Sequence, residues 1–292
     1  MPPYRYVSSD EDSARWDGFE LRDGDVVIST RTKHGTTWMQ TICGLLIFGT
    51  PDLPAPIAQL SPWLDWTVRP KDEVWTLLDA QAHRRFIKTH TPLDGIPLDD
   101  RVTYVVVARH PLDAAVSLYH QQLNLDRVRW AALTGNEPPD PARRTAPLHD
   151  SLLAWIEMDV DPREYLDSLP GVAHHLVDAW RRRDASNVVL VHYDDLQQDL
   201  EGSMRELAEQ LGIVVGEPVW PALVDAARFD AMKARASDTV PERDGVIRDH
   251  ERFFRAGVSG ARFDELTPAE LDDYEARMAA LAPPDLLRWL HR

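Results

Sequence analysis

Short apolar runs alternate with amphipathic segments along the chain. The apolar runs are continuous rather than alternating, which is typical of strands that are buried on both faces. The predicted strands cover 26–28, 86–87, 102–108 and 188–193. Helical spacing follows the last of them from Asp199 to Leu211, with Gly212 as its stop. This order predicts the α/β fold class: one domain with a mostly parallel central sheet flanked by helices.

A loop with one lysine and one glycine connects the first predicted strand to a helix. Lys33 and Gly35 precede Thr36 and Thr37, which open the helix. Free backbone N–H groups and the positive end of a helix dipole favour an anion there, so the loop predicts a phosphate site. The lysine precedes the glycine, so the loop departs from the nucleotide triphosphatase pattern G-x-x-x-x-G-K-S/T. An ordinary turn, in which the glycine only permits a tight bend, is the alternative.

A second unit of the same kind begins with the strand at 102–108. Arg109 follows the strand, Pro111 suits the first helical turn, and Ser117 lies two turns further on. Arginine offers a bidentate fork to a phosphate, and a serine hydroxyl adds one donor. The alternative is a strand-end arginine paired with a helix carboxylate such as Asp113.

A third segment, 85–93, places Lys88 and His90 at the end of a short strand. Ligands of open parallel sheets bind at the carboxyl ends of the strands. We therefore expect His90 to lie beside both phosphate motifs. A lone histidine is otherwise more often a surface or a core residue.

These segments resemble motifs of the cytosolic-type PAPS-dependent sulfotransferases. The run 30–38 is similar to the family's 5′-phosphosulfate loop, a P-loop-like element, and 109–117 is similar to its 3′-phosphate motif. The run 88–92 is similar to Lys-Thr-His-x-Pro, whose histidine is the catalytic base. The resemblance covers about 15–275 of a predicted single domain, 1–292, and implies PAPS as the donor co-substrate.

Further segments extend the resemblance. Tyr193 is similar to a tyrosine that lies by the adenine, Phe229 and Met232 fall in a Ser-Phe-x-x-Met-Lys-like segment, and 255–260 resembles a loop that folds over the nucleotide. The resemblance implies these cofactor-binding residues: Lys33, His34, Gly35, Thr36, Thr37, Trp38, Arg109, Ser117, Tyr193, Phe229, Met232, Arg255, Ala256 and Gly257.

Three positions depart from the family pattern. His34 replaces the serine after the loop lysine, and Ala256 replaces a lysine that helps to hold the 3′-phosphate. The family's dimer motif appears near 263–268 without its lysine or valine. A homodimer formed by that route is therefore doubtful.

The implied reaction moves a sulfonate group from PAPS to a hydroxyl and gives PAP and a sulfate ester. Lys33 stabilises charge on the leaving oxygen, Lys88 assists on the sulfonate, and His90 takes the proton of the acceptor hydroxyl. A neutral histidine is required, and an ordinary pKa of about 6.5 provides it at pH 7. The sulfonate carries one negative charge, so we expect no metal and activity in EDTA.

Composition narrows the partners. A net charge of −16 argues against nucleic acid as an acceptor, because long-range repulsion opposes its approach. The single cysteine, Cys43, sits on an apolar helix and is expected in the core. The first residues lack the apolar core of a signal peptide and no long apolar run follows, so we expect a cytoplasmic protein without membrane insertion.

The acceptor is left open between small alcohols, phenols and glycolipids. Trp63, Leu64 and Trp66, with Leu93 and Ile96, form either an apolar acceptor pocket near His90 or a core cluster. The segment 124–150 is expected to be an irregular, substrate-covering loop. Two alternatives remain: a P-loop-type kinase, which needs magnesium, and a non-catalytic relative that binds PAP and transfers nothing.

Overall fold

The computed structural model describes residues 3–138, 140, 145–240, 244–254, 257, 259, 260 and 262–292. Its sheet has four strands, β1 (Val26–Ser29), β2 (Phe86–Thr89), β3 (Thr103–Ala108) and β4 (Val188–His192). They are hydrogen-bonded in the order β2-β1-β3-β4, and every pair is parallel. The predicted α/β class with a parallel central sheet is confirmed.

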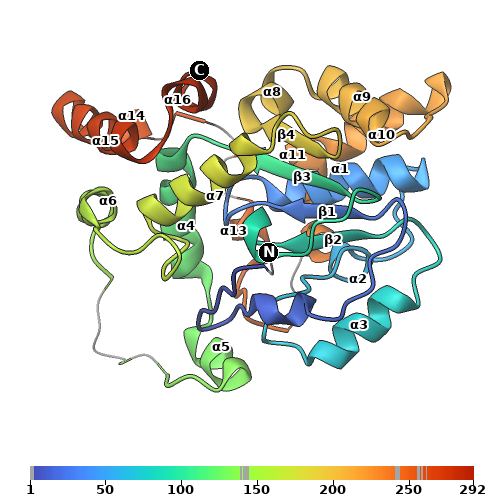
Figure 1. Ribbon diagram of the computed structural model, residues 1–292, viewed down its shortest axis with the longest axis horizontal. Helices are drawn as coiled ribbons and strands as arrows, with labels where there is room; N and C mark the ends of the chain where they lie inside the picture. The colour runs from blue at the N-terminus through green and yellow to red at the C-terminus, as the bar shows by residue number, and fades with distance from the viewer. Residues whose placement is uncertain are drawn as a thin grey trace.

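The strands are apolar on both faces because helices cover both (Figure 1). Val26 and Ile28 pack in one core cluster with Met39 and Ile42, whereas Val27 packs in another, on the opposite face of the sheet. In Figure 1, α2 and α3 lie beyond β2 at one end of the sheet, and α8, α9 and α10 lie beyond β4 at the other. Cys43 is fully buried in the first cluster, as expected.

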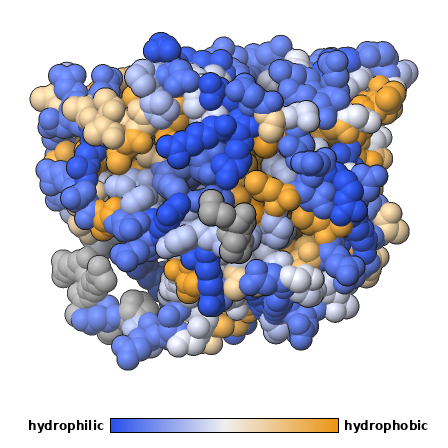
Figure 2. Space-filling view, in the orientation of Figure 1, coloured by the Kyte–Doolittle hydropathy of each residue, from blue (hydrophilic) through white to orange (hydrophobic). Residues whose placement is uncertain are grey.

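The helices have the following bounds: α1 (Thr36–Phe48), α2 (Ile57–Leu60), α3 (Lys71–Asp79), α4 (Pro111–Asn124), α5 (Arg127–Thr134), α6 (Leu148–Glu157), α7 (Leu169–Arg181), α8 (Tyr193–Gln198), α9 (Leu200–Gln210), α10 (Trp220–Ala227), α11 (Phe229–Ala234), α12 (Ala236–Thr239), α13 (His250–Phe253), α14 (Arg262–Glu265), α15 (Pro268–Leu281) and α16 (Pro284–Leu290). Within the described ranges, every helix is too short or too polar to span a bilayer. Figure 2 shows apolar side chains dispersed among hydrophilic ones on the face seen in Figure 1.

Three local predictions need correction. The strand β2 extends past Ile87 to Thr89, because Lys88 and Thr89 are buried despite their polarity and pair with β1. Tyr193 begins helix α8 instead of ending a strand. The segment 124–150 is also not irregular throughout.

Helix α5 occupies 127–134 within that segment. The Asp126 carboxylate caps its first turn by accepting from the Arg129 N–H at 2.9 Å, and Gly135 ends it with a φ of 71°. Only Ala131 of this helix is buried, so the apolar periodicity that predicts a helix is weak. In the sequence, only the capping residues Asp126 and Gly135 indicate this helix.

Candidate active site

A residue from the segment that follows each of the four strands lines a common cavity. Lys33 follows β1, His90 follows β2, Arg109 follows β3 and Tyr193 follows β4. Because all four strands are parallel, their carboxyl ends meet at one edge of the sheet. The cavity has a volume of about 400 Å³, within the range of small-molecule sites. The structure thus brings these four sequence-predicted residues together in one cavity.

The loop before α1 has a backbone shaped to receive an anion. Lys33 has a φ of 68° and Gly35 a φ of 110°, both left-handed. A Cβ on Gly35 would lie 3.0 Å from the Tyr193 ring and 3.3 Å from Val107, so glycine is required here on two grounds. Among the described residues no side chain caps α1, and residues 35–38 line the cavity. The first N–H groups of the helix therefore face a space that an anion can occupy.

Aromatic rings pack against two cations, Lys33 and Arg109, on the side of the cavity that the loop before α1 forms, the loop side. The Lys33 ammonium lies 4.2 Å from the centre of the Phe253 ring, on α13. The Arg109 guanidinium lies 4.4 Å from the centre of the Tyr193 ring, and its Nη1 is 3.5 Å from the Lys33 carbonyl oxygen. Stacking of this kind orients a guanidinium and leaves its edge available for hydrogen bonds.

Phe229, Met232 and Gly257 also line the cavity. The polar side chain of Ser117, on α4, lines it too. A Cβ on Gly257, whose φ is 64°, would lie 2.5 Å from the Phe229 ring, so this backbone passes directly over the ring. Of the predicted nucleotide-covering loop, Arg255 and Ala256 lie outside the described residues.

His90 is held in one tautomer by the backbone. It is 4% exposed, and its Nδ1 is hydrogen-bonded to the Thr30 carbonyl oxygen, which can only accept. The ring proton therefore sits on Nδ1, and Nε2 is the acceptor of the neutral ring. Burial, with the charges of Lys88 and Arg31, holds the His90 pKa well below its usual range. His90 is thus a neutral base at pH 7.

Lys88 is a buried ammonium beside the histidine. Its Nζ lies 3.9 Å from the centre of the Trp63 ring, whose edge packs against His90 with centroids 4.6 Å apart. Burial lowers the Lys88 pKa to about 8, and the negative charge of Glu11 opposes this shift. Both groups contact Trp63 and line the cavity there, a part that we call its tryptophan side.

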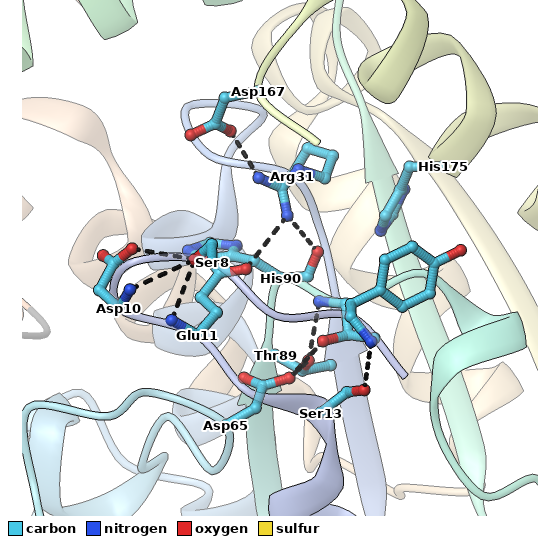
Figure 3. A network of polar contacts seen from close by, with 12 residues as sticks. Ser8, Asp10, Glu11, Ser13, Arg31, Asp65, Thr89, His90, Asp167 and His175 are labelled. Carbon is cyan, nitrogen blue, oxygen red and sulfur yellow. Dashed lines mark hydrogen bonds and ion pairs between the residues drawn. The ribbon is translucent and has the colours of Figure 1, made fainter. Parts of the chain in front are cut away.

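A polar network that the sequence analysis missed supports this arrangement (Figure 3). Arg31, 2% exposed, donates to the His90 carbonyl oxygen and to Asp167 at 2.5 Å. Asp65, fully buried, accepts from Thr89 and, at 2.6 Å, from Thr91. Asp65 therefore fixes the segment around His90 directly, and Asp167 fixes it through Arg31. The only sequence signal for this network is the charged Arg31 within the run 30–38.

His34 lies behind the loop rather than in the cavity. Its side chain is 1% exposed, and Nδ1 is 3.1 Å from the Thr32 carbonyl oxygen. Burial lowers its pKa to about 4, so the ring is neutral. The histidine that replaces the family's serine thus adds no charge beside Lys33.

The five candidate acceptor residues divide into two groups. Trp63 and Trp66 line the cavity as parallel rings, with centroids 5.1 Å apart. Leu64, Leu93 and Ile96 belong to the core cluster under the sheet. The bulky aromatic residues reach the cavity, whereas the aliphatic ones between and after them point inward.

Comparison with known proteins identifies the family. A model of the sulfotransferase domain matches residues 23–282. The chain belongs to the sulfotransferase family. A glycolipid sulfotransferase of Mycobacterium bovis is 43% identical, over 98% of this chain and 93% of the relative. Human sulfotransferase 2B1 is 28% identical, over 88% of this chain and 65% of the relative.

Solved structures agree with this sulfotransferase fold. Retinol dehydratase in complex with androsterone and PAP superimposes with a TM-score of 0.70 at 22% identity, over 95% of this chain and 84% of that one. Mouse sulfotransferase SULT7A1 with PAP gives a TM-score of 0.68 at 20% identity, over 95% and 92%. The predicted family and enzyme class are confirmed.

Proposed function

We propose that this sulfotransferase moves a sulfonate group from PAPS to a hydroxyl of a glycolipid. The observation that carries the proposal is the cavity shared by an uncapped helix N-terminus, two ring-held cations and a neutral histidine. PAPS supplies, when bound, a sulfonate joined to a 5′-phosphate and a second phosphate at the 3′ position. The 43% identical relative, a glycolipid sulfotransferase, supports the lipid-linked acceptor.

The residues present fit such a donor. The N–H groups of Thr36, Thr37 and Trp38, with the Lys33 ammonium, suit the 5′-phosphate. Arg109, with Ser117 on the same wall, suits the 3′-phosphate, and Tyr193 and Phe229 suit the adenine. Each of these groups lines the cavity.

The chain's own groups then divide the work of transfer. Lys33 neutralises charge that develops on the leaving oxygen, and Lys88, which lines the same cavity, assists on the sulfonate. His90 Nε2 accepts the proton of the acceptor hydroxyl while its Nδ1 stays hydrogen-bonded to Thr30. The Thr30 hydrogen bond also keeps the resulting imidazolium oriented.

The role of Arg109 is tested by nucleotide selectivity. We expect PAP to raise the melting temperature more than 5′-AMP does, because bound ligand stabilises the folded state according to its affinity. Arg109→Ala should weaken PAP binding by about 10–100-fold, the loss of a charged hydrogen bond, and change 5′-AMP binding little. Arg101→Ala, at a surface arginine that pairs with Asp99, is the control. Equal losses for both nucleotides would remove Arg109 from the 3′-phosphate site.

The Lys88 pKa predicts an alkaline limit to activity. Below about pH 8 the ammonium is charged, and above it the charge is lost, so kcat/KM should fall by about tenfold for each further pH unit. Lys88→Arg should move this fall in kcat/KM to a pH more than 2 units higher, since arginine stays protonated. Burial also raises the Glu11 pKa to about 8, so Glu11→Gln is the control. If Glu11→Gln abolishes the alkaline fall in kcat/KM and Lys88→Arg leaves it in place, the group that titrates is Glu11.

A metal-free reaction remains a prediction. The described part of the chain holds no group of three or more metal-ligating side chains. The kinase and the non-catalytic alternative are separated from this proposal by the assays below.

A further inference from the structure

The turn formed by residues 6–12, the N-terminal turn, builds one wall of the cavity. Residues 6–11 all line it, although the sulfotransferase domain match begins at residue 23. The turn is fixed by its backbone: Val7 pairs antiparallel with Asp12, and Glu11 pairs antiparallel with Trp66. The Thr67 N–H also donates to the Asp10 carbonyl oxygen at 2.8 Å. A rigid wall outside the matched domain is a natural place for selectivity toward the acceptor.

Glu11 is the functional group that this turn brings to the cavity. Its side chain is buried, and the residue is 8% exposed. Its charge partner among the described residues is Arg31, whose Nη1 lies 3.6 Å from Oε2, beyond ordinary hydrogen-bond length. No described residue donates a hydrogen bond to the Glu11 carboxylate, whereas Arg31 already binds Asp167 and the His90 carbonyl oxygen.

A buried carboxyl in this state lacks donors. A carboxylate offers about four lone-pair sites, and leaving them unfilled away from water is costly. A protonated carboxyl still has a carbonyl oxygen that accepts, so the need for a donor holds in either state. The donor has to come from whatever occupies the cavity.

Glu11 and His90 line the same cavity, and Arg31 contacts both of them (Figure 3). His90 Nε2 needs one hydroxyl, the one that is sulfated. Glu11 needs a second donor from the same molecule. Trp63 packs against the His90 ring, and Trp66 pairs with the backbone of Glu11, so the two tryptophans link both groups on one side of the cavity.

We propose that Glu11 accepts a hydrogen bond from a second hydroxyl of the acceptor, and thereby selects polyhydroxylated rings such as sugars over simple alcohols. This inference rests on the proposed sulfonate transfer. A site that hydrogen-bonds a substrate hydroxyl discriminates strongly against an analogue without it, because the buried partner is then left unpaired. Glu11 is thus a specificity-determining residue.

The test compares acceptors with one hydroxyl and with several. Octyl β-D-glucopyranoside, its monodeoxy analogues and 1-octanol share one chain length. We expect the wild-type kcat/KM for the glucoside to exceed that for octanol, and one deoxy analogue to lose about 10–100-fold, the cost of leaving one buried acceptor without a donor. The kcat/KM of Glu11→Leu for the glucoside should fall by as much. Its kcat/KM for octanol should change little, and its kcat/KM for that deoxy analogue should match that of the wild type.

Two variants control for structure. Glu11→Gln keeps the shape and one acceptor oxygen, and should fall between wild type and Glu11→Leu. Glu164→Gln removes an exposed carboxylate from the same cavity and should leave the acceptor ratio unchanged. The melting-temperature shift with PAP should survive in all three, which verifies folding and the nucleotide site.

The outcomes separate this inference from the proposed function. Transfer that does not favour the glucoside, or a Glu11→Leu variant that weakens all acceptors equally, overturns the role of Glu11 alone. If Glu11→Leu fails to fold, the wild-type comparison of deoxy analogues and Glu11→Gln still decide it. No transfer from PAPS to any acceptor overturns the proposed function, and this inference with it.

Discussion

Replacing His90 by alanine is expected to lower kcat by about 10²–10⁴-fold, the usual contribution of a positioned general base. Nε2 is the acceptor of a ring whose other nitrogen is fixed on Thr30, so the ring itself is the base. The melting-temperature shift with PAP should be retained, because the proposed nucleotide contacts lie on the loop side of the cavity. The measurement is single-turnover transfer from PAPS at saturating acceptor.

Two variants make the His90 result specific. His90→Asn keeps an amide donor for the Thr30 carbonyl but no base, and should be as impaired as the alanine variant. His149→Ala removes a histidine that is 43% exposed in its side chain and pairs with Glu270, and should be fully active. Unchanged transfer by His90→Ala would mean that another group takes the proton or that the chain transfers nothing.

Lys33→Ala is expected to lower kcat by about 10²–10³-fold, the effect of removing one preorganised group that stabilises developing charge. The backbone of the loop does not depend on the ammonium, so the N–H groups of α1 stay in place. PAP binding should therefore weaken far less than kcat falls. Single-turnover kinetics and PAP titration of the same variant measure the two effects.

Lys33→Arg and Lys71→Ala complete that comparison. The arginine variant restores the charge in a planar, wider head group and should recover part of the rate. Lys71 contacts Trp75 and the Asp17 carbonyl oxygen, outside the cavity, and its loss should leave kcat unchanged. A parallel loss of kcat and PAP affinity in Lys33→Ala would mean that Lys33 only holds the nucleotide.

The strand-ending motifs were predictable because each depends on a few residues close in sequence. The run 26–38 encodes a strand, an anion loop and a helix, and parallel pairing then brings Lys33, His90 and Arg109 to one edge. Gly35 was predicted as a phosphate-loop glycine. Its contact with Tyr193, over 150 residues later, required the structure.

The tryptophan side of the cavity was largely unpredictable. Glu11, Arg31 and Asp167 come from three distant segments, and nothing local marks a carboxylate as buried. From the sequence, Trp63 and Leu64 could equally belong to a pocket or to the core. In the structure Trp63 lines the cavity and Leu64 lies in the core. Long-range burial, rather than local pattern, decided these residues.

The most direct measurement of the central claim is transfer of label to octyl β-D-glucopyranoside from two donors in parallel. One assay uses ³⁵S-labelled PAPS in EDTA, and the other uses γ-³²P-labelled ATP with magnesium. We expect a ³⁵S-labelled ester in EDTA that His90→Ala nearly abolishes, and no ³²P-labelled product. Magnesium-dependent ³²P transfer without ³⁵S transfer would contradict the account, and PAP binding without any transfer would identify a non-catalytic relative.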